Sequence, residues 1–133
     1  MDFLLILLLC LALVVLTSII HYEVLRIASG LIPILPIAPR SRTLVTLAAA
    51  FFAHTLQIGL YALAYWFASA RMGLGQLAGA LEGGGAVDYL YYSAATFTTL
   101  GVGDIVLEGD LRLLAGIESL NGLVLITWSA SFT

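Results

Sequence analysis

The segment from Thr98 to Asp104, which reads TTLGVGD, contains residue types that can bind a cation through the backbone. Glycine adopts left-handed dihedral angles readily, so Gly101 and Gly103 permit an extended chain whose carbonyl oxygens all turn to one side. Stacked carbonyls of this kind can replace the hydration shell of a permeating cation, and a threonine hydroxyl can add a further oxygen. We therefore predict an ion selectivity filter over residues 99–104, with ion ligands from Thr99, Leu100, Gly101, Val102 and Gly103.

A nucleotide-binding loop is the alternative interpretation of the two alternating glycines. The dinucleotide fingerprint requires a third glycine three positions after the second, and Val106 stands there. The flanking sequence is also apolar enough to be membranous, which does not suit that fingerprint. We therefore predict no nucleotide cofactor, and no cofactor other than the permeating ion.

A short apolar segment, Asp88 to Phe97 (DYLYYSAATF), precedes the predicted filter. A bilayer requires about 20 helical residues, so this segment is too short to cross it and is typical of a re-entrant helix. Asp88 is placed to cap the N-terminus. The C-terminal end of the helix carries partial negative charge, which favours a cation in front of it. We predict a pore helix over residues 88–98. Four chains around one axis would bury the irregular backbone that follows it.

The composition places these segments in a membrane. Of the 133 residues, 62% are hydrophobic and 10% are charged, and the mean hydropathy is +1.09. Because a soluble domain averages about 25% charged residues, this composition argues against a soluble enzyme. The five basic residues are all arginine and the net charge is −3, which argues against a nucleic-acid partner. The single cysteine, Cys10, permits no disulfide framework and no zinc site.

Three apolar segments are long enough to cross a bilayer: residues 3–20, 43–70 and 111–133. The first resembles a signal peptide in length, but it lacks a basic start and a small-residue cleavage site. Tyr61, Tyr65 and Trp66 are typical of an aromatic belt at the membrane surface. We predict an all-α membrane protein. An N-terminal helix and its connection occupy residues 1–42, and a pore domain follows in 43–133, with an outer helix 43–70, a turret 71–87 and an inner helix 111–133.

The charges predict an orientation. The connection over residues 21–42 contains three prolines and three of the five arginines, so the positive-inside rule places it in the cytoplasm. The N-terminus and residues 71–110 then lie outside. An acidic mouth on that side would concentrate cations, and scattered solvated charges are the alternative. The acidic residues of the predicted outer side are Asp2, Glu82, Asp88, Asp104, Glu108 and Asp110, and the three arginines of the connection are Arg26, Arg40 and Arg42.

Taken together, residues 43–133 resemble the pore domain of potassium channels. The family filter, Thr-Val-Gly-Tyr-Gly-Asp, corresponds to residues 99–104, and the family's hinge glycine corresponds to Gly122. The family's Trp-Trp-Ser and Thr-Thr positions correspond to residues 91–93 and 98–99. The resemblance implies a homotetramer in the cell membrane that conducts potassium and is not an enzyme. It implies K⁺ ligands at Thr99, Leu100, Gly101 and Val102, and filter support from Tyr91, Tyr92, Thr98 and Asp104.

Three features depart from the family pattern. Val102 stands where the family has an aromatic residue in the filter, and Tyr91 and Tyr92 stand where it has a tryptophan pair. Ala95 stands where the family often has a carboxylate behind the filter. Because those groups hold the filter at a fixed width, a channel permeable to both sodium and potassium is one alternative. A non-conducting membrane scaffold or accessory subunit is another. The first span carries no arginine ladder, so we predict a peripheral helix outside the outer helix and no voltage sensor.

Four polar residues fall inside the predicted spans, where such groups usually pair with one another. The second span runs outward and the third inward, and a rise of 1.5 Å per residue places the four at similar depths. We predict that they form one buried network. A direct role for Glu118 as an ion ligand or proton sensor is the alternative. The four residues are His54, Gln57, Glu118 and Asn121.

Helical spacing from Gly122 places Ser119, Leu123 and Ile126 on one stripe, which we expect to face the central cavity. An apolar ring at Leu123 or Ile126 would gate by dewetting, and plain helix packing is the alternative. We expect membrane lipids around the helices. Gating is expected in the filter, in the inner helix or in a separate partner that the sequence does not identify.

Overall fold

The computed structural model describes residues 2–79, 85–101 and 103–132. Three long helices dominate it: α1 (Asp2–Leu31), α2 (Pro39–Arg71) and α4 (Leu111–Phe132). Each is long and apolar enough to cross a membrane. The predicted multi-pass, mostly helical protein is therefore confirmed. Large apolar side chains lie exposed along the outside of these helices, as expected for surfaces that face lipid.

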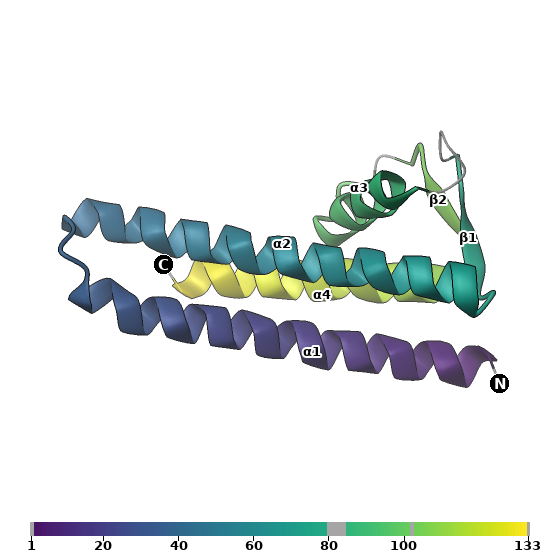
Figure 1. Cartoon of the computed structure of the whole chain (residues 1–133), viewed down its shortest axis with the longest axis horizontal. Helices are drawn as coiled ribbons and strands as arrows, with labels where there is room; N and C mark the ends of the chain where they lie inside the picture. Colours follow the sequence, from purple (N-terminus) through teal and green to yellow (C-terminus); the bar gives the residue numbers. More distant parts are fainter. Residues whose placement is uncertain (1, 80–84, 102, 133) are drawn as a thin grey trace.

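The three long helices lie along one another and form the body of the molecule (Figure 1). Leucine, alanine and other good helix formers fill them, and their apolar sides meet in a common core. Side chains of all three helices contribute, among them Ile6, Cys10 and Leu13 of α1 and Leu111, Leu114 and Leu125 of α4. The helices α1 and α2 continue beyond the end of α4 (Figure 1).

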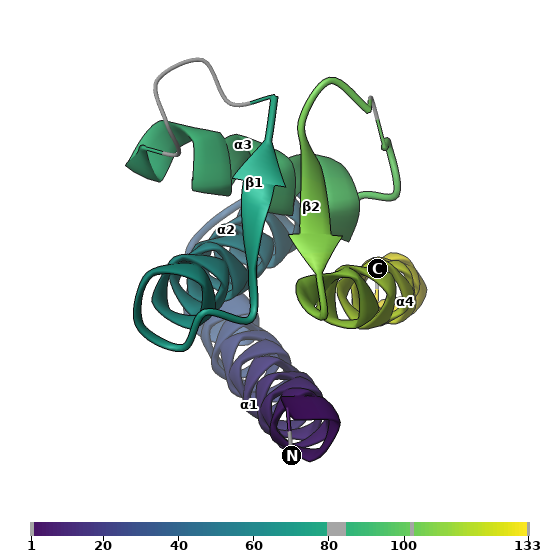
Figure 2. The same cartoon turned by 90° about the vertical axis from the view of Figure 1, so that its right-hand side faces the viewer.

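A short helix, α3 (Ala86–Phe97), lies across one end of the α2/α4 pair, on the side opposite α1 (Figure 2). The segment predicted to form a pore helix therefore forms a separate 12-residue helix, and its role in a pore remains a prediction. Asp88 does not cap it, because Gly85 is the N-cap residue and no side chain caps that end. The prediction of an Asp88 cap is wrong: the helix begins at Ala86, so Asp88 lies within its first turn.

Two short strands were missed by the all-α prediction. Strand β1 (Gly75–Ala78) pairs antiparallel with β2 (Val106–Gly109), with Gly75 opposite Gly109. They join the end of α2 to the start of α4, and α3 and the 99–103 segment lie between them in the chain. A Cβ atom on Gly75 would collide with the carbonyl oxygen of Glu108, so glycine is required for this close pairing. Glu82, in the predicted turret, lies outside the described residues.

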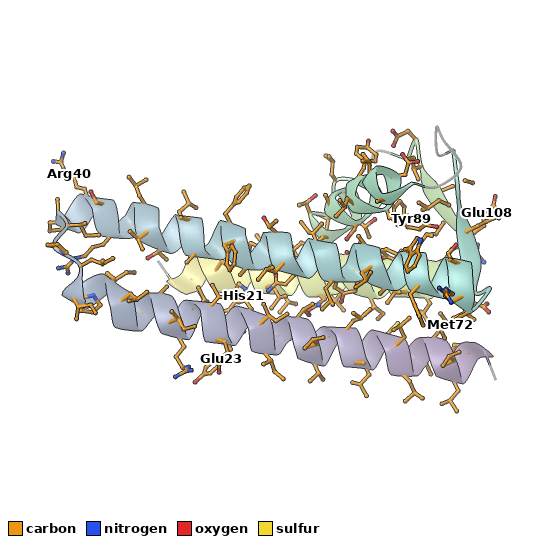
Figure 3. The ribbon with its side chains drawn as sticks, viewed as in Figure 1. His21, Glu23, Arg40, Met72, Tyr89 and Glu108 are labelled. Atoms are coloured by element: carbon orange, nitrogen blue, oxygen red, sulfur yellow. The ribbon has the colours of Figure 1, made fainter. Side chains whose placement is uncertain are left out.

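The first helix is longer than predicted. It continues through His21 to Leu31, and only a short 3₁₀ turn (Ile32–Ile34) and an extended segment separate it from α2. The predicted start of the connection at residue 21 is wrong, because the first proline comes at position 33. Arg26 consequently lies on α1, where it pairs with Glu23 on the exposed side (Figure 3). Arg40 lies at the start of α2 (Figure 3).

The predicted position of α1 is only partly correct. It lies away from α3, but it packs against α4 as well as against α2. Figure 3 shows His21 on the side of α1 that faces these two helices. The helix is therefore part of the packed body of the protein.

Candidate functional site

The backbone of the predicted filter follows directly from the end of α3. The φ angles of Thr99, Gly101 and Gly103 are 62°, 56° and 88°, so alternate residues adopt the left-handed conformation. In an extended chain this alternation turns successive carbonyl groups toward the same side. Thr99 is the only described residue other than glycine with a positive φ, a conformation that costs energy for a β-branched residue. Val102 lies outside the described residues, so its predicted role remains a prediction.

The end of α3 holds the start of this segment through backbone hydrogen bonds. The N–H groups of Leu100 and Gly101 both donate to the carbonyl of Ala95, at 2.9 and 3.2 Å. The N–H of Thr99 donates to Thr96 at 3.0 Å, and the Thr98 hydroxyl donates to Ala94 at 2.8 Å. These bonds use the last carbonyls of the helix, so the position of the segment depends on the position of α3.

Tyr91 and Asp104 meet beside the segment. The Tyr91 hydroxyl lies 3.1 Å from each oxygen of the Asp104 carboxylate, and Asp104 also accepts a hydrogen bond from the N–H of Ile105. Partial desolvation and the Asp104 carboxylate raise the pKa of the Tyr91 phenol, so it remains a donor at neutral pH. Tyr92 instead packs edge to face on Tyr65 of α2, with ring centroids 5.5 Å apart. The two tyrosines thus have separate partners.

A groove of about 380 Å³ lies behind the segment, between α3 and the first turns of α4. Small side chains line much of it, including Ala95, Ala115 and Gly116. The described lining contains no carboxylate.

Gly122 lies where α4 crosses the end of α3. A Cβ atom at this position would collide with the carbonyl oxygen of Phe97, so the helices approach closely only because the residue is glycine. The helix α4 is continuous through this point. The structure therefore explains Gly122 by close packing, and the hinge remains a prediction.

The predicted cavity stripe on α4 is not uniform. The Ser119 hydroxyl donates to the carbonyl of Thr96 on α3 at 3.0 Å. Leu123 is exposed, whereas Ile126 is half-buried and packs against the core. Of these three side chains, Leu123 is the one that projects freely from the described chain.

Glu118 forms a buried cluster with Tyr65 of α2 and Ser93 of α3, which we call the carboxyl cluster. All three residues have an exposed fraction of 0%. The Tyr65 hydroxyl donates to Oε1 of Glu118 at 2.6 Å, and Oγ of Ser93 lies 2.7 Å from Oε2. Oγ of Ser93 also lies 2.8 Å from the carbonyl oxygen of Ile58. The cluster therefore joins α4, α2 and α3.

Four side chains form a closed ring of hydrogen bonds farther along α4, which we call the hydrogen-bond ring. Its members are His21 of α1, His54 and Gln57 of α2, and Ser129 of α4, and neighbouring members are 2.9–3.3 Å apart. The Gln57 amide nitrogen also donates to the carbonyl of Thr17, which only accepts, so the orientation of the amide is determined.

Counting donors and acceptors determines which atoms of the ring carry the remaining protons. The amide of Gln57 donates to Nδ1 of His21, so the His21 proton lies on Nε2 and is donated to Ser129. Ser129 then donates to Nε2 of His54, whose Nδ1–H donates to the Gln57 oxygen. Every hydrogen has one acceptor when both imidazoles are neutral.

Asn121 lies between the two groups. Its amide nitrogen donates to the hydroxyl oxygens of Thr17 at 2.7 Å and Tyr61 at 2.8 Å. Tyr61 is fully buried, as is Tyr65. The predicted aromatic belt is therefore wrong for these two tyrosines, because their hydroxyls bind polar groups inside the helix bundle. Trp66 is 42% exposed, which leaves that part of the prediction open.

The predicted network of four residues is not a single network. His54 and Gln57 are bonded directly, and Asn121 reaches Gln57 through Thr17. Among the described residues, no hydrogen bond joins Glu118 to the other three. The depth estimate assumed that α2 and α4 end level with each other. In the structure α2 extends well beyond α4 (Figure 1), and His54 bonds to Ser129 and not to Asn121, so the estimate placed the helices about two turns out of register.

The residues that sequence analysis missed are the partners on other helices. Thr17 and His21 are four residues apart, which puts both on one face of α1. Tyr61 and Tyr65 repeat the same spacing on α2. This periodic placement of polar side chains in apolar helices was the available signal. The missed partners are Thr17, His21, Tyr61, Tyr65, Ser93 and Ser129.

These features define a multi-pass membrane protein. Two of its three long helices, α2 and α4, flank a short helix and a loop with alternating left-handed residues. A family model described as an ion channel matches residues 42–133. The chain therefore belongs to this ion-channel family of two-helix pore domains, and the resemblance found in the sequence is confirmed. The search of curated proteins and the search of solved structures gave no match.

Proposed function

We propose that the protein is a tetrameric, potassium-conducting channel of the cell membrane. Backbone carbonyls of residues 99–103 from four chains form its selectivity filter, and K⁺ is the transported substrate. The carrying observation is the alternation of left-handed backbone at Thr99, Gly101 and Gly103, directly after the end of α3. A row of carbonyls on one side of the chain replaces ion hydration, and the negative end of α3 favours a cation in front of it.

Assembly around a four-fold axis is part of the proposal. Leu100 is 70% exposed, and Thr99, Gly101 and Gly103 are also exposed in the single chain. Irregular backbone at membrane depth must be buried in protein or line a water-filled cavity. Four copies around an axis would satisfy this requirement and would bring the four rows of carbonyls together.

The proposed topology follows the charges. Figure 3 shows Arg40 at the end of the bundle far from α3, and Arg42 follows it in the first turn of α2. The positive-inside rule assigns that end to the cytoplasm. The half-buried carboxylate of Asp88 and the exposed carboxylates of Asp104 and Glu108 belong to the segment from α3 to β2 near the opposite end (Figure 1), where they would attract cations to an outer mouth. The N-terminus then lies outside.

The test is the bi-ionic reversal potential of the purified protein in a planar bilayer, with potassium on one side and sodium on the other. A value near the potassium limit supports the proposal. A current that reverses near zero contradicts potassium selectivity. A confirmed tetramer with no current under any condition contradicts conduction, and a strictly monomeric or dimeric protein in mild detergent favours the scaffold alternative.

A channel permeable to both sodium and potassium is the second candidate. Tyr92 and mostly small side chains line the groove behind the proposed filter, and Ala95 stands where the family often has a carboxylate. A filter with less support from behind discriminates less between ions of different size. The same reversal-potential measurement distinguishes the two candidates.

A further inference from the structure

Glu118 is an acidic residue in a position where a negative charge has no counter-ion. Its side chain is completely buried, and the described chain contains no ion pair that involves it. The titratable groups that face it are the phenols of Tyr61 and Tyr65 on α2 and of Tyr92 on α3. A buried carboxylate without a cation is costly, so the neutral form is favoured at this site.

The hydrogen bonds lead to the same assignment independently. Ser93 has one hydroxyl hydrogen but two acceptors, the carbonyl of Ile58 at 2.8 Å and Oε2 of Glu118 at 2.7 Å. If Glu118 is ionised, one of these two short oxygen–oxygen contacts has no hydrogen between its atoms, because the Ser93 hydroxyl can donate only once. If Glu118 carries a proton on Oε2, it donates to Ser93, and Ser93 donates to Ile58. Tyr65 then donates to Oε1, and every polar atom has its partner.

We propose that Glu118 is protonated at neutral pH and that its neutral carboxyl group positions the pore helix α3 between α2 and α4. This proposal rests on the proposed channel function for its consequence, although the protonation itself does not. The carboxyl binds Ser93 in the middle of α3, and the last carbonyls of α3 hold Leu100 and Gly101. Glu118 is therefore a positioning residue for the filter and does not contact the ion path.

The proton is tested by infrared difference spectroscopy of the wild-type protein against Glu118→Gln at neutral pH. The expected difference contains the carbonyl stretch of a protonated carboxylic acid. Glu108→Gln, which removes an exposed carboxylate, serves as the matched control and should lack this band. A wild-type minus Glu118→Gln spectrum that contains only carboxylate bands would overturn the proposal. This measurement does not require that the protein conduct.

The positioning role is tested by conduction. Glu118→Gln preserves an acceptor for Tyr65 and a donor for Ser93, so we expect its potassium-to-sodium permeability ratio to stay within about twofold of the wild type. Glu118→Ala leaves both hydroxyls without this partner, and we expect the ratio to fall about tenfold. A ratio for Glu118→Gln as low as that of Glu118→Ala would overturn the proposal.

The pH profile separates positioning from general structural support. Raising the pH should ionise Glu118 and reduce wild-type conductance, whereas Glu118→Gln should not respond over the same range. Because Glu118→Gln retains Tyr61, Tyr65 and Tyr92, an unchanged alkaline response in this variant would assign the titration to another group and overturn the proposal. Absence of current from the wild type contradicts the channel function instead, and the infrared result then decides the protonation.

Discussion

The carboxyl cluster and the hydrogen-bond ring both satisfy polar side chains inside a membrane protein, but they do so in two different ways. The carboxyl cluster is an open chain of donors that begins at Tyr65, continues through Glu118 and Ser93, and ends on the carbonyl of Ile58. The hydrogen-bond ring is closed, and each of its four members donates to the next. The first needs a proton on an acid, and the second needs two neutral bases.

The two groups also join different helices. The carboxyl cluster connects α4 and α2 to α3, which directly precedes the proposed filter segment. The hydrogen-bond ring connects α4 and α2 to α1. Loss of the first should therefore change conduction, whereas loss of the second should loosen the N-terminal helix. The following variants test this difference.

The largest expected effect comes from Gly122→Ala, which acts on α4 between the two groups. The added Cβ collides with the carbonyl of Phe97, so α4 must move away from α3. We expect a loss of about 3 kcal/mol in unfolding free energy, typical of overpacking at a rigid contact. Unfolding in mixed detergent micelles measures it. Gly59→Ala is the control, because nothing lies within 4 Å of its added Cβ. Equal stability of Gly122→Ala and the wild type would contradict the close contact.

Ser129→Ala interrupts the hydrogen-bond ring and leaves a ring nitrogen of His21 and one of His54 without a partner. Interhelical hydrogen bonds in membranes are individually weak, so we expect a loss of about 1–2 kcal/mol for the two together. The same unfolding assay measures it, and α1 should become more accessible to proteolysis. Ser131→Ala removes an exposed hydroxyl bonded to its own helix and should change neither quantity. An equally large loss in Ser131→Ala would show that the ring contributes nothing specific.

Tyr65→Phe removes one donor from the carboxyl cluster and leaves Oε1 of Glu118 without its partner. Because one hydrogen bond is lost, we expect the unfolding free energy to fall by about 0.6 kcal/mol, which is less than the loss expected for Ser129→Ala. The permeability ratio should fall in Tyr65→Phe and stay unchanged in Ser129→Ala. Tyr22→Phe, on an exposed position of α1, is the matched control. A change in selectivity for Ser129→Ala but not for Tyr65→Phe would reverse the proposed division of roles.

The smallest expected effect comes from Tyr91→Phe, which removes the exposed hydrogen bond to Asp104. We expect the permeability ratio to change by about twofold or less, since an exposed hydrogen bond contributes little. The raised pKa of Tyr91 means that the bond is present at neutral pH and is lost only as the pH rises through that raised value. Reversal potentials at several pH values check this. A response of Tyr91→Phe that matches Glu118→Gln would assign the alkaline effect to Tyr91.

Local sequence signals predicted the elements near the filter well. The segment Asp88 to Phe97 is too short to cross a bilayer and is bounded by glycines and threonines. The helix predicted over residues 88–98 forms α3 with an error of two residues at its start and one at its end. The glycines at 101 and 103 predicted the alternating backbone, because the preference of glycine for positive φ is a property of a single residue. The left-handed conformation of Thr99 has no such local signal.

Pairings between helices were predicted less well. The depth argument identified four residues that are buried or half-buried, but it matched the wrong partners across α2 and α4. It depended on where each helix ends, and the ends differ in depth because the turns and strands that connect them differ. Tyr61 and Tyr65 were assigned to the membrane surface for the same reason. Their hydroxyls could be placed only after the register of α4 against α2 was known.

The amino-acid sequence by itself determined that this protein is a multi-pass membrane protein with a short helix and a glycine-containing loop between its last two long helices, because hydropathy, chain length and glycine conformation act locally along the chain. The tertiary structure alone decided which polar side chains meet, that α1 contacts α4, and that Glu118 faces a serine already bonded to a carbonyl. These are consequences of helix register, which is set by many packing contacts at once. A shift of one helical turn would leave the same sequence with different partners for every buried polar group.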